Sequence, residues 1–262
     1  MTIDIVIVNW NAGEQLRDCI ASVRAHHSGV VGKCIVVDNG STDGSADFLD
    51  GAADVDLVRA GQNLGFGRAC NLGARRGTSP FILLLNPDAC LMAGSLALPL
   101  DTLQKPEHAA LGIVGVQLLG EDGAVQRTCA RAPTPARLAA KSFGLTAFFK
   151  QADFQMKTWD HMETRRVDQV MGAFFLMRRS LFDLLGGFDE RFFVYFEEVD
   201  FSRRAAQAGF GTLYLTGAQA FHKGGGVSDQ VKAHRLFYSL RSRLQYRSEE
   251  RRVGKEGRSR WS

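Results

Sequence analysis

The sequence predicts an α/β fold in which a mostly parallel central sheet carries helices on both faces. Short apolar runs recur along residues 1–118 and alternate with segments of helical periodicity. The runs are continuously apolar instead of alternating with polar residues, as expected for strands that are covered on both faces. The connections between runs are short, which favours parallel strands joined by crossover helices.

The expected elements follow in chain order. A helix over residues 13–26 places Leu16, Cys19, Ile20 and Val23 on one face. The Ser41-Thr42-Asp43 stretch offers N-cap residues for a helix that continues to Leu49. Residues 65–77 are expected to form a loop that enters a helix, residues 131–166 an irregular segment, residues 181–210 two short helices around a turn, and residues 220–226 a loop. The expected strands are residues 3–8, 33–37, 55–58, 81–85, 113–118, 169–178 and 212–215.

The composition is that of an ordinary globular protein, with 45% hydrophobic and 23% charged residues among 262. No apolar run approaches the ~20 residues of a membrane-spanning helix, and the first ten residues lack the basic leader of a signal peptide. The five cysteines are dispersed without a CxxC pair, which is typical of reduced thiols in a cytoplasmic protein. We therefore expect a cytoplasmic protein.

The net charge of +4 does not indicate a nucleic-acid partner, because residues 247–262 supply most of it with six basic and three acidic side chains. These residues have no apolar periodicity and resemble the in-frame translation of a sequencing-library adapter, so we interpret them as a non-native tail. A native, solvated basic tail is the alternative. On the first interpretation, the native C-terminus is missing after about Tyr246.

Polar clusters follow the first four expected strands. In open α/β sheets, ligands bind at the carboxyl ends of the strands. A GxGxxG turn and a P-loop are both absent from the sequence, which disfavours nicotinamide binding and leaves phosphates to be held by a metal and cations. Asp88 is a candidate metal ligand to which Asn86 adds an oxygen, Asp38 can accept hydrogen bonds from a nucleobase or ribose, and Arg68 can meet a phosphate. The clusters are Asn9-Trp10-Asn11, Asp38-Asn39-Gly40-Ser41, Asn63-Leu64-Gly65-Phe66-Gly67 and Asn86-Pro87-Asp88.

Three acids, Glu197, Glu198 and Asp200, fall within four positions between aromatic residues. Clustered carboxylates raise one another's pKa, so that one of them can act as a base near neutral pH. The alternative is that acids at a helix N-terminus only favour the macrodipole. His222, before three glycines, is a candidate metal ligand or phosphate contact.

These stretches occur together and in a specific order, and in combination they resemble an inverting family 2 glycosyltransferase of the rhamnosyltransferase-like branch. The resemblance covers about residues 3–246. It rests on VIVNWN, VVDNGSTDGS, NLGFGRACNLG, LLLNPDA, MGAFFLMRRSLFDLLGGFDERFFVYFEEVDFSRRAAQAGF and HKGGG.

The resemblance implies a GT-A-type fold that binds a nucleotide sugar, in a single domain over residues 1–246. Residues 1–118 would form the nucleotide-binding part and residues 119–246 the acceptor and catalytic part. It also implies a dTDP- or UDP-sugar donor, most often dTDP-L-rhamnose, and Mg²⁺ or Mn²⁺. The acceptor would be a glycan or lipid-linked glycan of the cell envelope, reached by peripheral contact with the inner face of the membrane.

The same resemblance assigns functions to individual residues. Asp88 and His222 would bind the metal, and Glu198 would be the base, with Glu197 as its rival because many members have Asp at the position of Glu198. Asp200 would organise the base or pair with Arg203 or Arg204. The expected donor site comprises Asn9, Trp10, Asn11, Asp38, Asn39, Ser41, Asn63, Gly65, Phe66, Arg68, Asn71, Asn86 and Gly172, with the Trp10 ring stacked on the nucleobase. Gly172 would let the backbone pass close to the donor sugar, although an ordinary strand bulge explains a glycine equally well.

Two other functions remain open, and a hydrolase is a weaker third option. A sugar-nucleotide pyrophosphorylase would place a Gly-rich loop with Arg and Lys after the first strand, where this chain has NWNAGEQ. A non-catalytic nucleotide- or glycan-binding protein would not need three clustered acids beside a metal site. A glycoside hydrolase suits paired acids but leaves the nucleotide loops unexplained.

Overall fold

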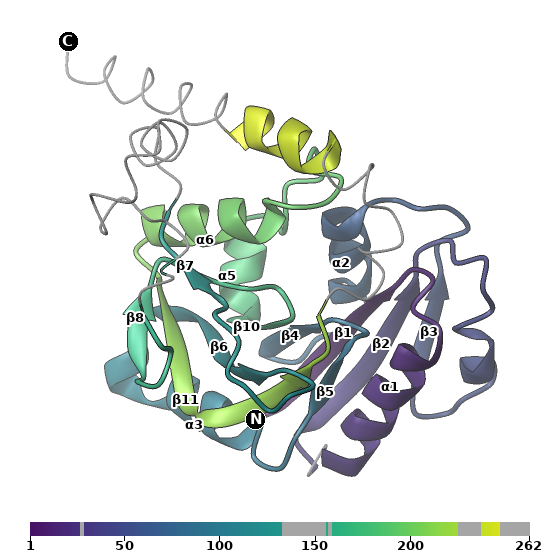
Figure 1. Cartoon of the computed structure of the whole chain (residues 1–262), viewed down its shortest axis with the longest axis horizontal. Helices are drawn as coiled ribbons and strands as arrows, with labels where there is room; N and C mark the ends of the chain where they lie inside the picture. Colours follow the sequence, from purple (N-terminus) through teal and green to yellow (C-terminus); the bar gives the residue numbers. More distant parts are fainter. Residues whose placement is uncertain (27–28, 133–155, 157–158, 225–236, 247–262) are drawn as a thin grey trace.

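The computed structural model describes residues 1–26, 29–132, 156, 159–224 and 237–246. Its central feature is a nine-stranded mixed sheet with the strand order β3-β2-β1-β4-β10-β6-β11-β5, to which β8 adds by pairing with β11 (Figure 1). The α/β class predicted from the sequence is confirmed. The strands are β1 (Ile3–Asn9), β2 (Val31–Asp38), β3 (Asp56–Arg59), β4 (Phe81–Leu85), β5 (Ala89–Leu91), β6 (Leu111–Leu119), β8 (Arg165–Val167), β10 (Phe174–Arg178) and β11 (Gly211–His222).

Most strands of the sheet run in one direction. β1 pairs in parallel with β2 and β4, β2 with β3, and β6 with β11. The exceptions are β10, which lies antiparallel between β4 and β6, and β5 and β8, which lie antiparallel to β11. The carboxyl ends of β1, β2 and β4 therefore meet at one edge of the sheet.

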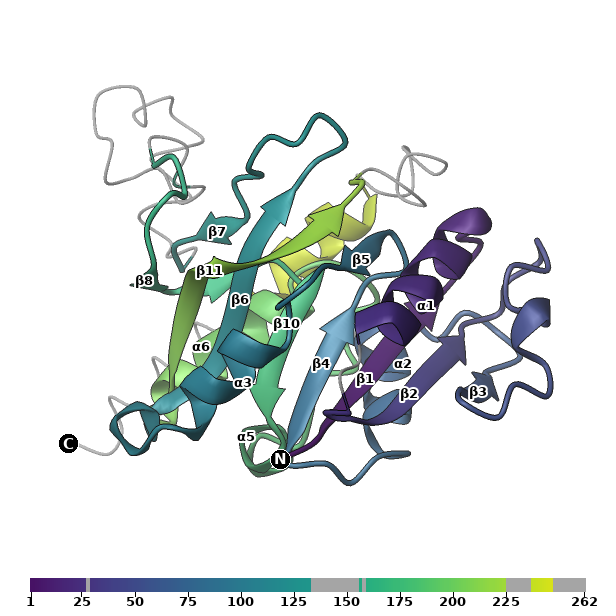
Figure 2. The same ribbon diagram turned by 90° about the horizontal axis from the view of Figure 1, so that it is seen from below.

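Helices cover both faces of the sheet, which explains the continuous apolar runs. Along β1, Ile3, Ile5 and Ile7 belong to the core shared with α1, whereas Val6 and Val8 belong to the core shared with α2. Figure 2 shows α1 and α3 on one face, and Figure 1 shows α2, α5 and α6 on the other. The helices are α1 (Glu14–His26), α2 (Phe66–Ala74), α3 (Ala97–Gln104), α5 (Arg179–Leu184) and α6 (Glu197–Gln207), with short 3₁₀ helices η1 (Asp47–Leu49) and η2 (Pro106–His108).

Three sequence expectations about elements are wrong in detail. The helix expected to continue to Leu49 is only the 3₁₀ turn η1, because Asp43 and Ser45 bond to each other instead of opening a longer helix. The strand expected over residues 169–178 is two strands, β9 (Gln169–Val170), which pairs with β7 (Cys129–Ala130), and β10. The loop expected from residue 220 begins after β11, since that strand continues to His222.

Strand β11 is the element that completes the sheet. Its pairing with β6 is interrupted by a register shift between Leu215 and Gln219, after which it continues past the end of β6. Its last residues pair with β5, with His222 opposite Ala89. Among the described strands, β5 pairs with β11 alone.

No helix within the described part of the chain has the length and apolar character needed to cross a membrane. Most of the expected irregular segment, the glycines at 225 and 226, and the tail 247–262 lie outside the described residues.

Candidate active site at the carboxyl edge of the sheet

The first and second polar clusters form one buried hydrogen-bond network. Asn9, at the end of β1, is fully buried. Its side-chain nitrogen, Nδ2, lies 3.2 Å from Asp38 Oδ1, 3.0 Å from Ser41 Oγ and 2.9 Å from Ser45 Oγ. Arg59 Nη1 lies 3.4 Å from the other oxygen of Asp38. Asn9 therefore fixes the loop that follows β2. Asp38 is held between the side-chain amide of Asn9 and the guanidinium of Arg59.

The third cluster is tied to the second through side-chain amides. Asn39 donates to Asn63 Oδ1 (3.1 Å) and accepts from the backbone amide of Leu64 (2.8 Å). Asn63 accepts in turn from the amide of Gly65 (2.9 Å). These bonds bring the loops after β2 and β3 together at the start of α2.

A hollow of about 480 Å³ opens beside these loops, between residues 11–15 and residues 42–43. Asn11 lines it and joins the two walls, since its amide donates to Ser41 Oγ (3.0 Å) and its Oδ1 accepts from the amide of Thr42 (2.8 Å). Trp10 is half-buried next to Asn11. Of the predicted donor residues, Asn11 lines this open space and Ser41 contacts Asn11, and the space is of suitable size for part of a nucleotide.

Two residues expected at the donor site make other contacts in the structure. Asn71, on α2, donates to the carbonyl of Phe188 (2.9 Å) and accepts from its amide (2.8 Å). Arg68, one turn earlier, forms an ion pair with Glu190 at 3.0 Å. Both side chains therefore fasten the turn after α5 to α2, and Arg68 would have to leave Glu190 before meeting a phosphate.

The pairing of β5 with β11 brings Asp88 and His222 together. The His222 Nε2 atom lies 3.5 Å from Asp88 Oδ1, an oxygen that is buried and has no hydrogen-bond partner among the described residues. The amide of Lys223 donates to the carbonyl of Asp88 (3.0 Å), which fixes the backbone at this point. Asn86, at the end of β4, is half-buried near Asp88, and its amide donates to the carbonyl of Ala173 (3.0 Å).

Asp88 and His222 fit a divalent cation that is also held by phosphate oxygens. The described residues contain no group of three or more His, Cys, Asp or Glu side chains that could hold a metal by themselves. Mg²⁺ in nucleotide sites commonly takes only one or two protein ligands and completes its shell with phosphates and water. An unsatisfied buried carboxylate oxygen facing an imidazole nitrogen suits such a site.

Glu197 and Glu198 form the first turn of α6, against α2. Tyr195 and Phe196 precede them with positive φ values of 68° and 74°, a strained pair of conformations for non-glycine residues. The Glu197 side chain packs beside Gly67, where an added Cβ would lie 3.6 Å from Glu197 Cβ. The sequence predicted a helix N-terminus here. The left-handed conformations of Tyr195 and Phe196 turn the chain so that this helix begins against α2.

The carboxyl groups of Glu197 and Glu198 are both held in environments that disfavour charge. Burial raises the pKa of Glu197 well above its usual range, and the neighbouring Glu198 raises it further. Burial also raises the pKa of Glu198, against the effect of its own amide and that of Val199. One oxygen of each carboxyl group is buried without a hydrogen-bond partner in the described part of the chain. A carboxylate in this state is a stronger proton acceptor than an exposed glutamate.

Asp200 has a structural environment. Its side chain is 2% exposed and accepts from Arg203 Nη2 (3.0 Å) and Arg204 Nε (2.6 Å). Arg204 also donates to the carbonyls of Leu185 (2.9 Å) and Gly187 (3.0 Å). The expected pairing of Asp200 with arginines one turn on is confirmed, and it ties α6 to the turn after α5.

Gly172 faces open space. A Cβ built there meets nothing within 4 Å, and its φ is not in the left-handed region. Neither crowding nor backbone strain within the described protein therefore demands glycine at this position.

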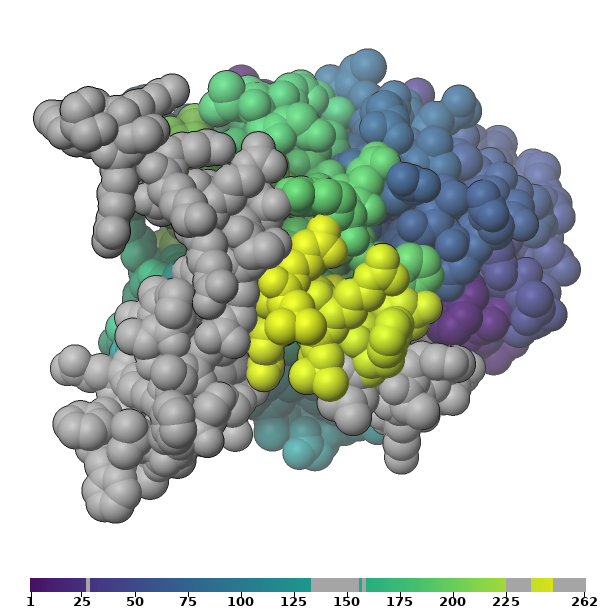
Figure 3. All heavy atoms as spheres, turned by 90° about the horizontal axis from the view of Figure 1, so that it is seen from above, coloured from purple at the N-terminus to yellow at the C-terminus, as the bar shows by residue number. Residues whose placement is uncertain are grey.

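A helix at residues 237–246 packs over residues 193–198, here called the acid-bearing turn, and lies beside it on the face seen in Figure 3. The ring of Tyr238 stacks on Phe193 at 4.6 Å, and Ser242 Oγ donates to the carbonyl of Val194 (2.8 Å). Tyr246, 1% exposed, packs near Phe196.

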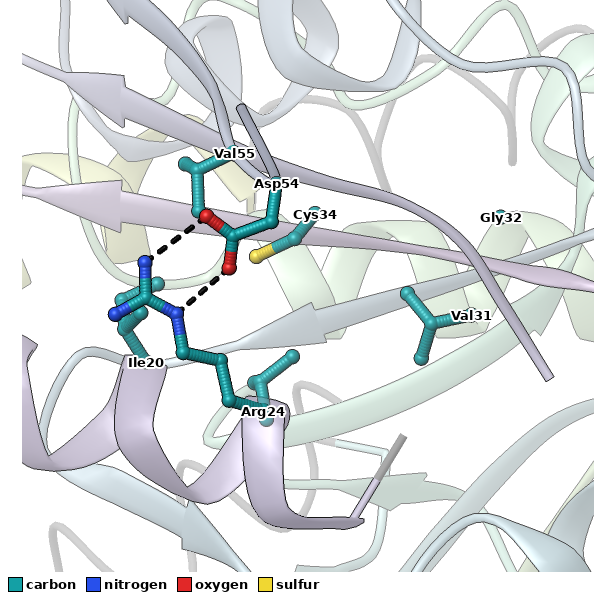
Figure 4. A pocket seen from close by; sticks show the side chains of 8 residues that line it. Ile20, Arg24, Val31, Gly32, Cys34, Asp54 and Val55 are labelled. Carbon is teal, nitrogen blue, oxygen red and sulfur yellow. Dashed lines mark hydrogen bonds and ion pairs between the residues drawn. The ribbon is translucent and has the colours of Figure 1, made fainter. Parts of the chain in front are cut away.

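A second hollow, of about 200 Å³, lies at the amino end of β2 and is remote from the predicted site residues. The Arg24–Asp54 ion pair (2.6 Å) spans it, with Cys34 behind (Figure 4). Burial raises the pKa of Cys34 to about 12, so this thiol is not reactive at neutral pH.

Several residues of the site were not identified from the sequence. Ser45 is the last residue of the VVDNGSTDGS stretch, but it was not predicted to belong to the site. Arg59 and Gln126 gave no signal, because their partners Asp38 and His222 lie on other strands and only the folded sheet reveals them.

Comparisons with known proteins agree with this architecture. The family model for glycosyl transferase family 2 matches residues 4–186. A curated protein of Mycobacterium tuberculosis named N-acetylglucosaminyl-diphospho-decaprenol L-rhamnosyltransferase is 30% identical over 234 residues, which cover 83% of this chain and 75% of that protein.

Two solved structures are similar in fold. The crystal structure of GalNAc-T7 with UDP, GalNAc and Mn²⁺ matches with a TM-score of 0.64 and 17% identity over 85% of this chain, which spans less than half (43%) of that chain. The mannosyltransferase PcManGT from Pyrobaculum calidifontis, in complex with GDP-Man and Mn²⁺, matches with a TM-score of 0.60 and 17% identity over 93% of this chain and 64% of its own.

Proposed function

The chain belongs to glycosyl transferase family 2 and is a glycosyltransferase, and from this premise we propose that it transfers L-rhamnose from dTDP-L-rhamnose, with inversion, to a lipid-linked or polysaccharide acceptor. The observation that carries the proposal is the Asp88–His222 pair, which lies just after β4, the neighbour of β1, whose end leads into the hollow beside Asn11. The buried acids of α6, which contact the start of α2 at Gly67, support it.

The donor and acceptor are supported by the mycobacterial relative. Its name specifies L-rhamnose as the transferred sugar and a diphospho-decaprenol-linked sugar as the acceptor. At 30% identity over most of both chains, the same class of reaction is the best-supported proposal. Such an acceptor would be reached by peripheral contact with the inner face of the membrane.

The nucleotide would bind at the ends of β1 and β2. Asp38 is positioned to accept from the imide N–H of thymine or uracil or from a ribose hydroxyl, since Asn9 and Arg59 fix its two oxygens. Trp10, half-buried beside the hollow, offers a ring for stacking. Asn39 and Asn63 would shape the loop around the donor, since Asn39 donates to Asn63 Oδ1.

The diphosphate would lie near Asp88 and His222, which would hold Mg²⁺ or Mn²⁺. Both solved relatives described above contain Mn²⁺. When bound, a divalent ion neutralises the charge that develops on the leaving diphosphate.

Glu198 is the proposed base. An acceptor hydroxyl is a poor nucleophile at neutral pH, so a carboxylate must take its proton as it attacks the anomeric carbon. Glu198 is half-buried, whereas Glu197 is 4% exposed and packs against α2. A base must touch the acceptor, and this difference in exposure supports Glu198.

The test is a donor screen with dTDP-L-rhamnose, UDP-sugars and GDP-sugars, with and without a synthetic N-acetylglucosaminyl diphosphate polyprenol, in Mn²⁺ or EDTA. We expect dTDP release and a new glycoside only with dTDP-L-rhamnose, acceptor and metal, with inverted anomeric configuration by NMR. Tight nucleotide binding without release under any condition would instead indicate a non-catalytic binding protein. Consumption of pyrophosphate would indicate a pyrophosphorylase.

A further inference from the structure

Gln126 makes an unusual double contact with a single residue, His222. Gln126 Nε2 donates to the carbonyl oxygen of His222 (2.7 Å), and Gln126 Oε1 lies 2.7 Å from His222 Nδ1. No sequence motif marked this glutamine, and the proposed function does not use it.

The backbone holds Gln126 in place for this contact. After β6 the chain reverses through a tight turn in which the amide of Gly120 donates to the carbonyl of Ala124 (2.9 Å). On the returning strand the amide of Gln126 donates to the carbonyl of Leu118 (2.8 Å).

The double contact determines which way the glutamine amide points. The His222 carbonyl can only accept, so the NH₂ group of Gln126 must face it. The oxygen of the same amide then faces the ring, and because it can only accept, the ring proton must lie on Nδ1. In the neutral ring, Nε2 is consequently a bare lone pair.

That lone pair faces Asp88. Two acceptor atoms, His222 Nε2 and Asp88 Oδ1, then lie 3.5 Å apart in a site where both side chains are nearly buried. Within the part of the chain that the structure describes, Asp88 Oδ1 has no hydrogen-bond partner. Such an arrangement is unfavourable by itself and becomes favourable around a cation. Histidine ligands of metals usually donate their second ring N–H to a fixed acceptor, which sets the tautomer.

We propose that Gln126 is a positioning residue that holds His222 in the Nδ1-protonated tautomer and aims its Nε2 at a divalent cation shared with Asp88. This inference rests on the proposed function, in which the same pair binds the metal, but it concerns a residue that does not touch donor or acceptor.

The experiment compares Gln126→Leu, Gln126→Glu and wild type in binding Mn²⁺ in the presence of dTDP, followed by EPR of the free ion. We expect Gln126→Leu to weaken Mn²⁺ binding roughly 10- to 100-fold, as is usual when such a partner is lost. Gln126→Glu keeps an acceptor for Nδ1–H but loses the donor to the His222 carbonyl, so it should restore only part of the affinity. Gln219→Leu is the matched control, because Gln219 is a half-buried glutamine on β11 whose side chain donates to Gln117 (2.7 Å) and not to His222.

A second readout does not depend on the metal. In wild-type protein without metal, ¹⁵N NMR of the His222 ring should show a proton on Nδ1 and a bare Nε2, and Gln126→Leu should lose this preference. A proton on Nε2 in the wild type would overturn the proposal. So would equal Mn²⁺ affinities for wild type and Gln126→Leu when both are folded by circular dichroism, and in that case the metal site itself would stand. A wild type that binds no Mn²⁺ with dTDP would overturn both this inference and the proposed metal dependence.

Discussion

The backbone amide of Phe66 donates a 2.7 Å hydrogen bond to the carbonyl oxygen of Phe193. This bond joins the start of α2, which follows the loop of Asn63, to the turn that leads into Glu197 and Glu198. With the bonds of Asn71 and the Arg68–Glu190 ion pair, it makes α2 the physical connection between the loops proposed for the donor and the proposed base. Substitutions that break this connection should therefore lower activity and stability together. Substitutions of the acids of α6 should instead change activity and stability separately.

The first prediction concerns the two neighbouring glutamates. Glu198→Gln should abolish sugar transfer while dTDP binding, measured by calorimetry, survives, because the amide keeps the shape but cannot accept the proton. Glu197→Gln should retain activity within about tenfold. Full activity in Glu198→Gln, or the reverse ranking of the two variants, would reject Glu198 as the base.

The second prediction concerns the pH dependence of stability. The pKa of Glu197 is raised in the folded state, so the folded protein binds more protons than the unfolded chain above the ordinary value of 4.5. The free energy of unfolding should therefore fall as pH rises from about 4.5 through the raised value. Glu197→Gln should remove part of this fall and raise Tm more at pH 8 than at pH 5.

Glu107→Gln, at an exposed position on η2, is the control and should leave the profile unchanged. A Glu197→Gln protein that is destabilised more at pH 8 than at pH 5 would contradict the assignment.

The third prediction separates Asp200 from the acids that do chemistry. Asp200→Asn leaves Arg203 and Arg204 without their buried partner and should lower the free energy of unfolding by about 3 kcal/mol. The loss should be visible in urea unfolding as a lower midpoint with an unchanged slope. Asp183→Asn, on the exposed side of α5, should have no measurable effect. If Asp200→Asn kept wild-type stability and lost only kcat, Asp200 would belong to the catalytic group after all.

The fourth prediction tests the contact between Gly65 and the acid-bearing turn. Gly65 has a φ of 85°, and a Cβ there would collide with the Phe193 carbonyl and ring. Gly61 has a similar φ of 74° but open space around it. Gly61→Ala should therefore cost only the left-handed strain, roughly 1–2 kcal/mol, whereas Gly65→Ala should cost clearly more and also reduce transfer. Equal losses for the two variants would show that the close approach to Phe193 is unimportant.

The fifth prediction concerns Gly172. Since an alanine methyl at this position meets no described protein atom, Gly172→Ala should leave Tm within about 2 °C of wild type. If the open space receives the donor sugar, the same variant should lower kcat/KM for transfer at least tenfold. Unchanged kinetics in a folded Gly172→Ala protein would favour an ordinary irregularity between β9 and β10.

The parts of the fold that were predictable are those whose signals are local. The runs at β1 and β4 are apolar because both faces of these strands are buried, so the strand positions follow from the sequence directly. The short strand β5 was not predicted, because three residues give no periodicity and its position depends on pairing with β11. The end of β11 was misplaced for the same reason, as the pairing of His222 with Ala89 is not encoded near either residue.

The candidate site likewise contains contacts that could be predicted from the sequence and contacts that could not. Asn9 and Asp38 lie together because the ends of neighbouring parallel strands must meet, and this could be inferred from the sequence. The contacts of Arg68 and Asn71 could not be predicted, because their partners at residues 188 and 190 come more than a hundred positions later. Gln126 was invisible for an equivalent reason, since its significance lies entirely in the orientation of another side chain.

The attachment of β5 to the sheet has a consequence for biosynthesis. The segment bearing Asp88 emerges from the ribosome long before β11, yet it has no strand to pair with until residues 211–222 have been made. The loops after β1 and β2 can assemble on the nascent chain, while the loop at Asp88 must wait for nearly the whole chain to be translated. If the proposed function is right, a chain that stops short of β11 would therefore form the loops proposed for the nucleotide before it could form the proposed cation site.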